Sequence, residues 1–206
     1  AGRHLLRLIG DILDFSKIEA GNMILEKIPF SVREVSEEVI STLLIKAREE
    51  NSQLVIDIAP KTPMCVLGDP TRFRQIIMNF LSNALKFTKN GTVTLKVESS
   101  REEPEHVELK VSVIDTGVGI SQEKINKLFK SFSQVDNTIT RNYGGTGLGL
   151  SISKQLVEAM NGSVGVESIE GEGSTFWFKI RLPISEQEIE VESQQEDYDI
   201  PPLNIL

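Results

Sequence analysis

The chain has 206 residues, of which 39% are hydrophobic and 25% charged, and its formal net charge is −8. This length and composition are ordinary for a globular protein of one or two domains. Seven acidic residues lie beyond Arg181, where no Lys or Arg follows, so the rest of the chain is nearly neutral. We therefore expect neither nucleic-acid binding nor contact with an anionic membrane.

The sequence also argues against a disulfide-bonded, a zinc-binding and a membrane-spanning protein. The single cysteine, Cys65, cannot form an internal disulfide, and with only two histidines in the chain a zinc site is not expected. No apolar run reaches the roughly 18 residues that span a bilayer, and no signal-peptide pattern occurs. We expect a cytoplasmic chain, which is compatible with a parent protein anchored in a membrane through other segments.

The first predicted element is an amphipathic helix over residues 3–19, ended by Ala20-Gly21. Its apolar stripe follows heptad spacing and consists of Leu5, Leu8, Ile12 and Phe15, widened by Leu6, Ile9 and Leu13. A stripe this wide needs a partner, either another helix or a second copy of the chain.

Helix starts are marked by capping residues. Ser31 with Glu34 is a capping box that opens a helix through Ala47, and Asp69 before Pro70 opens another that reaches about Thr88. Ser121 caps a third helix, and a fourth runs over residues 151–160 to the stop signal Asn161-Gly162.

Alternating apolar and polar residues predict strands at 23–30, 54–58, 92–98, 107–114, 164–169 and 175–182, with a polar hairpin loop at 99–105. Residues 133–146 are polar, irregular and long enough for a lid. The elements predict an α/β fold of two layers, in which three helices cover one face of a mixed, mostly antiparallel sheet, preceded by the amphipathic helix.

A glycine-rich stretch from Tyr143 to Leu150 leads into the last helix. Each glycine costs about 1 kcal/mol in a helix interior relative to alanine, so the stretch predicts a loop that stops at a helix N-terminus. Free N–H groups and the helix dipole favour an anion there. For the glycines alone, a flexible hinge remains the alternative.

Two asparagines and a lysine lie on one face of the helix that Asp69 caps. Asn79 and Asn83 are four residues apart, and Lys86 lies three beyond Asn83. Amide oxygens suit Mg²⁺ that is held mainly by water and phosphate, and a lysine supplies a point charge for phosphate. The alternative is a pair of exposed or capping asparagines beside a surface lysine.

A carboxylate follows an apolar strand at Asp115, within Asp-Thr-Gly-Val-Gly-Ile. It could accept a hydrogen bond from an exocyclic amine such as that of adenine, while Gly117 and Gly119 let a flat ring approach the backbone. An ordinary Asp-Thr-Gly turn is the alternative.

Taken in order, five segments resemble the N, G1, F, G2 and G3 boxes of the sensor histidine kinases. They are Asn79…Asn83…Lys86-Phe87, Asp115-x-Gly-x-Gly119, Phe129-x-x-Phe132, Gly145-Thr-Gly-Leu-Gly149 and Gly171-x-Gly-Ser-Thr175. The resemblance covers roughly residues 4–182. It implies the family's Bergerat-type ATP fold, an α/β sandwich shared with gyrase-type ATPases, with ATP and Mg²⁺ as cofactors.

The resemblance also implies a role for each residue. Asn79 and Lys86 would be catalytic, with Lys86 on the phosphates, and Asn83 would be the Mg²⁺ ligand. Asp115 would read the adenine amine, with Thr175 close to Asp115. The other implied ATP contacts are Phe87, Gly117, Gly119, Ile120, Phe132, Gly145, Thr146, Gly147, Leu148, Gly149 and Leu150.

Position 79 separates the branches of that fold. The ATP-hydrolysing relatives hold a glutamate there that acts as general base toward water, and Asn79 cannot take a proton at neutral pH. Phosphoryl transfer to another group is therefore favoured. The alternatives are an ATPase on the same fold and a degenerate module that only docks a receiver domain.

The segment Asp14–Gly21 is similar to the end of the family's second dimerisation helix. The family's acceptor histidine, followed by an acid and Arg-x-Pro, has no match, since His4 is followed by Leu5-Leu6-Arg7. We expect residues 1–21 to be part of the dimerisation hairpin and residues 22–183 to be the catalytic ATP-binding domain. The partners implied are a second copy in the intact protein and a receiver domain.

The C-terminal residues suggest a hybrid kinase. Pro202-Leu203-Asn204-Ile205-Leu206 resembles the opening strand of a receiver domain. Residues 184–206 are therefore expected to be an acidic linker that runs into a truncated receiver, although any apolar chain end would look similar.

Overall fold

The computed structural model describes residues 20–125 and 148–185, together with positions 10, 13, 16–18 and 128. Its main sheet has five strands in the order β2-β4-β5-β7-β6, and β1 and β3 form a separate pair. Only β2 and β4 run parallel within the main sheet. The strands are β1 (Ile28–Phe30), β2 (Gln53–Ile58), β3 (Val66–Gly68), β4 (Thr92–Glu103), β5 (His106–Asp115), β6 (Ser163–Ile169) and β7 (Gly173–Pro183).

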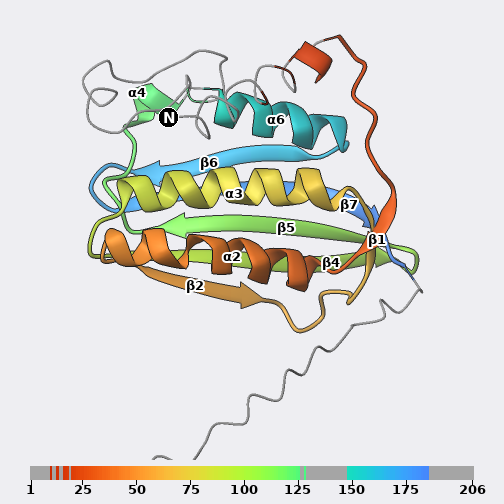
Figure 1. The fold of residues 1–206 in the computed structure, drawn as a ribbon, viewed down its shortest axis with the longest axis horizontal. Helices are drawn as coiled ribbons and strands as arrows, with labels where there is room; N and C mark the ends of the chain where they lie inside the picture. Colours follow the sequence, from red (N-terminus) through yellow and green to blue (C-terminus); the bar gives the residue numbers. More distant parts are fainter. Residues whose placement is uncertain are drawn as a thin grey trace, which may run out of the picture.

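Three long helices cover one face of this sheet (Figure 1). They are α2 (Val32–Glu49), α3 (Pro70–Phe87) and α6 (Gly149–Ala159), and the short α4 (Gln122–Ile125) follows β5. The two-layer α/β prediction is therefore confirmed. No described helix is long and apolar enough to cross a membrane.

The core lies between the helices and the sheet, and α3 supplies much of it. Phe73 and Phe80 of α3 are fully buried, and both meet the ring of Phe178 from β7, at centroid distances of 5.8 and 6.1 Å. Along β7 the residues alternate between buried and more exposed. This alternation is what a sheet with one buried face requires.

Two of the three predicted side-chain caps, those of Ser31 and Asp69, form, while the predicted cap Ser121 precedes α4 and accepts from the Lys124 N–H through its backbone carbonyl at 2.9 Å. The Ser31 hydroxyl accepts a hydrogen bond from the Glu34 N–H at 3.1 Å. The Asp69 carboxylate accepts one from the Arg72 N–H at 3.0 Å and another from the Glu26 N–H at 3.1 Å. Asp69 therefore fixes both the start of α3 and the segment before β1.

That second bond explains why one predicted strand is wrong in length. A strand was predicted over residues 23–30, but only Ile28–Phe30 is strand. The Glu26 N–H bonds to a side chain instead of a neighbouring strand. The three-residue β3 was missed because an element this short shows no alternation.

The predicted hairpin loop at residues 99–105 is also wrong. The strand β4 continues to Glu103, with an irregular register between Ser100 and Glu103, and pairs with β5 from His106 onward. Polar residues are compatible with this extension because strand pairing uses the backbone.

The lead-in helix is described at positions 10, 13 and 16–18, which are helical. It ends as predicted, since Gly21 takes a φ of +67° and its N–H bonds to the Ile18 carbonyl at 2.9 Å. The remaining residues of 1–19, the lid at 133–146 and the tail beyond 185 lie outside the described residues.

Candidate functional site

The predicted site residues gather at one end of the molecule. The C-terminal half of α3, the end of β5, the turn between β6 and β7 and the N-terminus of α6 meet there (Figure 1). Four predicted contacts, Phe132, Gly145, Thr146 and Gly147, lie outside the described residues.

A buried carboxylate lies at the end of β5. Asp115 is 7% exposed, and its Oδ1 accepts a hydrogen bond from the Gly117 N–H at 2.9 Å. Burial raises the pKa of the Asp115 carboxyl above its ordinary value of 3.8, while the backbone N–H groups of Gly117 and Ser174 act against that rise. A buried carboxylate has more lone pairs than these donors use, so it can accept from a ligand.

The Thr88 hydroxyl completes this corner. It lies near enough to the Asp115 carboxylate to favour its charged form. Among the described residues, however, the buried Thr88 Oγ1 makes no hydrogen bond of acceptable geometry. A buried hydroxyl that lacks a hydrogen bond usually indicates a site for a ligand or an ordered water. Here the Thr88 hydroxyl lies beside the Asp115 carboxylate, so a polar planar ligand or a water could bond to both.

Glycine is required in the loop after β5. A Cβ on Gly117 would overlap the Phe87 carbonyl oxygen and lie 2.8 Å from Asp115 Oδ1. Gly119 has a φ of +66°, and a Cβ there would overlap the Ile169 carbonyl oxygen. The loop is therefore pressed against α3 on one side and against the end of β6 on the other.

Two further hydrogen bonds fasten this loop to the β6–β7 hairpin. The Ile120 N–H donates to Ser168 Oγ at 2.8 Å, and the Gly171 N–H donates to the Val118 carbonyl at 2.8 Å. The predicted site residue Ile120 is partly buried against the core. Ser168 was not predicted from the sequence. Its role depends on the loop after β5, some 48 residues earlier in the chain, and no local pattern shows that contact.

The side chain beside Asp115 is Ser174, not Thr175 as predicted. In the β5–β7 register Asp115 lies opposite Ser174, and Thr175 lies opposite Ile114. Paired residues of an antiparallel ladder point to the same face. Ser174 is buried like Asp115, whereas Thr175 lies between Ile114 and Glu167 on the face away from the helices.

The two asparagines of α3 are bonded to each other and to α6. The Asn79 Nδ2 donates to Ser153 Oγ at 2.8 Å, and the Asn83 Nδ2 donates to Asn79 Oδ1 at 3.4 Å. Both residues are half-buried and lie inside α3. They are therefore neither fully exposed asparagines nor helix caps. Asn83 Oδ1 has no hydrogen-bond partner among the described residues, which leaves one neutral oxygen available for a cation.

Lys86 and Phe87 follow on the last turn of α3. Burial lowers the pKa of the Lys86 ammonium below its ordinary value of 10.5. Its Nζ lies 5.0 Å from the centre of the Phe87 ring. The Phe87 side chain is 37% exposed, so an apolar face remains available beside the charge.

The N-terminus of α6 faces the same region. The helix begins at Gly149, and its N-cap residue, Leu148, makes no side-chain capping hydrogen bond. Leu148 and Leu150 pack into or against the core, which fixes the direction of the first turn. The N–H groups at a helix start and the helix dipole favour an anion.

The side chains at this site fit a cation that is bound mainly by phosphate and water and only in part by the protein. Among the described residues, no three His, Cys, Asp or Glu side chains lie together so as to hold a metal ion. An amide oxygen such as Asn83 Oδ1 is a hard but neutral ligand, which suits Mg²⁺ that is also bound by phosphate and water.

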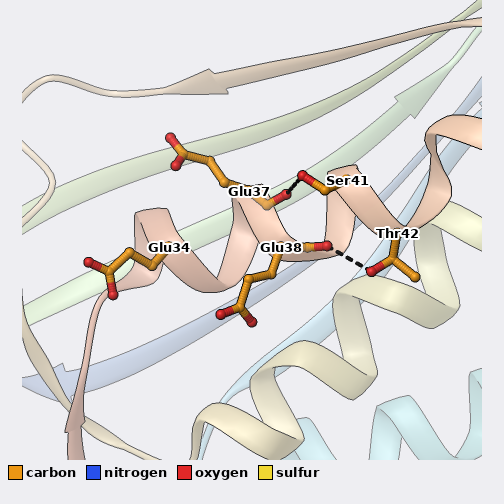
Figure 2. Close-up of a pocket in the computed structure, with 5 residues that line it drawn as sticks. All are labelled: Glu34, Glu37, Glu38, Ser41 and Thr42. Atoms are coloured by element: carbon orange, nitrogen blue, oxygen red, sulfur yellow. Dashed lines mark hydrogen bonds between the residues drawn. The ribbon is translucent and has the colours of Figure 1, made fainter. Parts of the chain in front are cut away.

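A depression lies elsewhere, on the exposed side of α2 (Figure 2). Ser41 and Thr42 donate there to the carbonyls of Glu37 and Glu38, at 2.8 and 2.9 Å. The remaining lining residue is Glu34. The lining includes no cationic side chain, and its three carboxylates, of which Glu37 and Glu38 pair with Arg33 and Arg74, do not suit a phosphate ligand.

Comparisons with known proteins agree with this geometry. Residues 68–184 match the family described as "Histidine kinase-, DNA gyrase B-, and HSP90-like ATPase". Sensor protein GacS of Pseudomonas syringae pv. syringae is 44% identical over 198 residues, which cover 96% of this chain and 21% of GacS. Hybrid signal transduction histidine kinase B of Dictyostelium discoideum is 46% identical over 180 residues, covering 87% of this chain and 9% of that protein.

Among solved structures, full-length ShkA in complex with AMPPNP superposes with a TM-score of 0.75 at 33% identity, over 89% of this chain and 37% of ShkA. The chain spans about a fifth or less of the length of the two curated relatives.

Proposed function

The chain belongs to the histidine kinase-, DNA gyrase B- and HSP90-like ATPase family, and we propose that it is the ATP-binding catalytic domain of a two-component sensor histidine kinase. The observation that carries this proposal is the buried Asp115 carboxylate beside a loop that only glycine fits. A carboxylate in that position accepts a hydrogen bond from the adenine amine, while Gly117 lets the ring approach.

The other residues of the site would hold the triphosphate. Asn83 Oδ1 would bind the divalent cation, the Lys86 ammonium would neutralise phosphate charge, and the N–H groups at the start of α6 would donate hydrogen bonds to phosphate oxygens. Bound Mg·ATP supplies the γ-phosphoryl group and the charge neutralisation that phosphoryl transfer needs. The part of the chain predicted as the lid lies outside the described residues.

The identity of residue 79 favours transfer over hydrolysis. The Asn79 amide cannot accept a proton, and its Nδ2 is already bonded to Ser153. We therefore assign transfer to a histidine outside this site. In that step the bond from the γ-phosphorus to its bridging oxygen breaks, a phosphorus–nitrogen bond to the imidazole forms, and ADP leaves. The phosphoryl group then passes to a receiver aspartate.

The partners of the whole protein follow from the same proposal. The stripe of Leu5, Leu8, Ile12 and Phe15 would pair with a second copy in a dimerisation bundle. We infer that the residues from Pro202 onward begin a receiver domain, which is supported by a relative named as a hybrid kinase.

The proposal is tested with ATP labelled in the γ-phosphoryl group and a separately supplied dimerisation hairpin of GacS. We expect label on the hairpin in an acid-labile form, as for phosphohistidine, and none with Asn83→Ala. Steady release of phosphate without a hairpin, lost on Asn83→Ala, would instead support an ATPase.

A further inference from the structure

A row of hydrogen bonds runs from α6 to the candidate cation ligand. Ser153 Oγ accepts from Asn79 Nδ2 at 2.8 Å, and Asn79 Oδ1 accepts from Asn83 Nδ2 at 3.4 Å. Ser153 is 2% exposed, so water does not compete readily for its hydroxyl. The row ends at Asn83 Oδ1, which has no partner among the described residues.

Each amide has a donor end and an acceptor end, whereas a serine hydroxyl can serve as either, so the direction of the row is set by the bonds in the structure, in which Ser153 Oγ is the acceptor. Since Ser153 takes the Nδ2 end of Asn79, the Oδ1 end faces Asn83. Asn83 must then turn its own Nδ2 toward Asn79, which leaves Oδ1 outward. The reverse arrangement would leave Asn83 Nδ2 outward, and a donor N–H₂ cannot bind a cation.

A second contact from α6 holds the same amide. A Cβ on Gly149 would overlap Asn79 Oδ1 and lie 3.1 Å from Cγ and 3.2 Å from Nδ2. Gly149 and Ser153 are four residues apart, on the same face of α6. The Asn79 amide is therefore confined by the first turn of α6 and bonded by the second.

We propose that Ser153 is a positioning residue for the divalent cation of the nucleotide complex. Its hydroxyl orients Asn79, and Asn79 orients Asn83 so that Oδ1 is the atom presented to the cation. This inference rests on the proposed function, because it requires Asn83 to be the cation ligand. Partners of this kind around a metal ligand typically change metal affinity 10- to 100-fold.

A merely structural role for Ser153 makes a different prediction. Loss of an α3–α6 contact would weaken folding and would weaken nucleotide binding with and without the cation alike. Loss of positioning weakens only the cation-dependent part of ATP binding, because no hydrogen bond among the described residues joins Ser153 to Asp115. The quantity that distinguishes the two roles is therefore the Mg²⁺ concentration at the midpoint of the increase in ATP affinity.

The experiment measures ATP binding to the 206-residue chain across a Mg²⁺ series and in EDTA, for the parent and Ser153→Ala. We expect Ser153→Ala to need on the order of tenfold more Mg²⁺, with its ATP affinity in EDTA unchanged. The matched control is Ser36→Ala, since Ser36 is also buried but its hydroxyl donates to the Val32 carbonyl within α2. It should follow the parent in both conditions.

Two further variants keep the test decisive if Ser153→Ala does not fold. Ser153→Thr keeps the hydroxyl and should keep the parent's Mg²⁺ requirement, whereas Ser153→Val, of the same shape, should lose it. In addition, Ser153→Val in an Asn83→Ala background should change the Mg²⁺ requirement no further.

The outcomes separate the two proposals. A parent that binds Mg·ATP while Ser153→Ala or Ser153→Val matches its Mg²⁺ requirement would overturn the positioning role and leave the proposed function intact. A parent that binds no ATP under any condition would overturn the proposed function itself.

Discussion

Gly149 at the start of α6 leaves the space that the Asn79 amide of α3 fills. A Cβ at position 149 would overlap Asn79 Oδ1 and come within 3.1 Å of Asn79 Cγ. The last glycine of the glycine-rich stretch is therefore needed for packing between two helices. Its role is distinct from the loop flexibility that glycines suggest in sequence.

Gly149→Ala tests this packing. The added methyl group should displace Asn79, and overpacking of this kind costs roughly 1–3 kcal/mol, partly offset by the higher helix propensity of alanine. Urea unfolding should show a net loss of stability. The double variant Gly149→Ala with Asn79→Ala should regain it, because the amide is gone; equal stability of Gly149→Ala and the parent would contradict the packing role.

The strand register predicts which hydroxyl serves the nucleotide. Ser174 lies beside Asp115, whereas Thr175 lies on the face away from the helices. Ser174→Ala should weaken ATP binding by roughly 1 kcal/mol, the usual worth of one hydrogen bond, and Thr175→Ala should leave it unchanged. Fluorescent ATP-analogue titrations distinguish the two, and the opposite ranking would restore the sequence-based assignment.

The Asp69 cap should matter more than the Ser31 cap. Ser31 satisfies one backbone N–H and Asp69 satisfies two, those of Arg72 and Glu26. Ser31→Ala should cost about 1 kcal/mol in the free energy of unfolding, and Asp69→Ala about 1 kcal/mol more. Chemical denaturation of both variants measures this, and equal costs would mean that the Glu26 contact is not stabilising.

The pKa of Asp115 predicts a pH dependence of stability. Because burial raises that pKa in the folded chain above 3.8, the folded chain binds more protons than the unfolded chain just above this pH. The group's contribution to stability therefore falls as pH rises through that window. Asp115→Asn removes this titration, so its stability relative to the parent should increase from pH 3.8 toward neutral. A difference in the free energy of unfolding between Asp115→Asn and the parent that stays constant over this pH range would argue against a raised pKa of Asp115.

The parts of the fold predicted from sequence depend on local signals. Caps such as Ser31 and Asp69 act on N–H groups three residues away, and the alternation of β7 reflects one buried face. Asp115 could be singled out because a carboxylate at the end of an apolar strand needs a partner. These inferences need no knowledge of distant residues.

The parts that were missed depend on contacts between distant segments. The position of Ser174 beside Asp115 follows from the β5–β7 register, and the roles of Gly149 and Ser153 follow from how α6 packs on α3. A buried serine within a helix carries no sequence signal of its own. Only the folded arrangement shows which amide it bonds.

The most direct test of the account is a calorimetric ATP titration of the 206-residue chain with Mg²⁺, beside Asp115→Asn. As control we choose Asp57→Asn, an exposed carboxylate on β2. We expect the parent and Asp57→Asn to bind ATP. Asp115→Asn should bind it roughly 100-fold more weakly or not at all, because the acceptor for the adenine amine is changed. Equal binding by Asp115→Asn, or no binding by the parent, would contradict the claim that this corner of the fold is an ATP site.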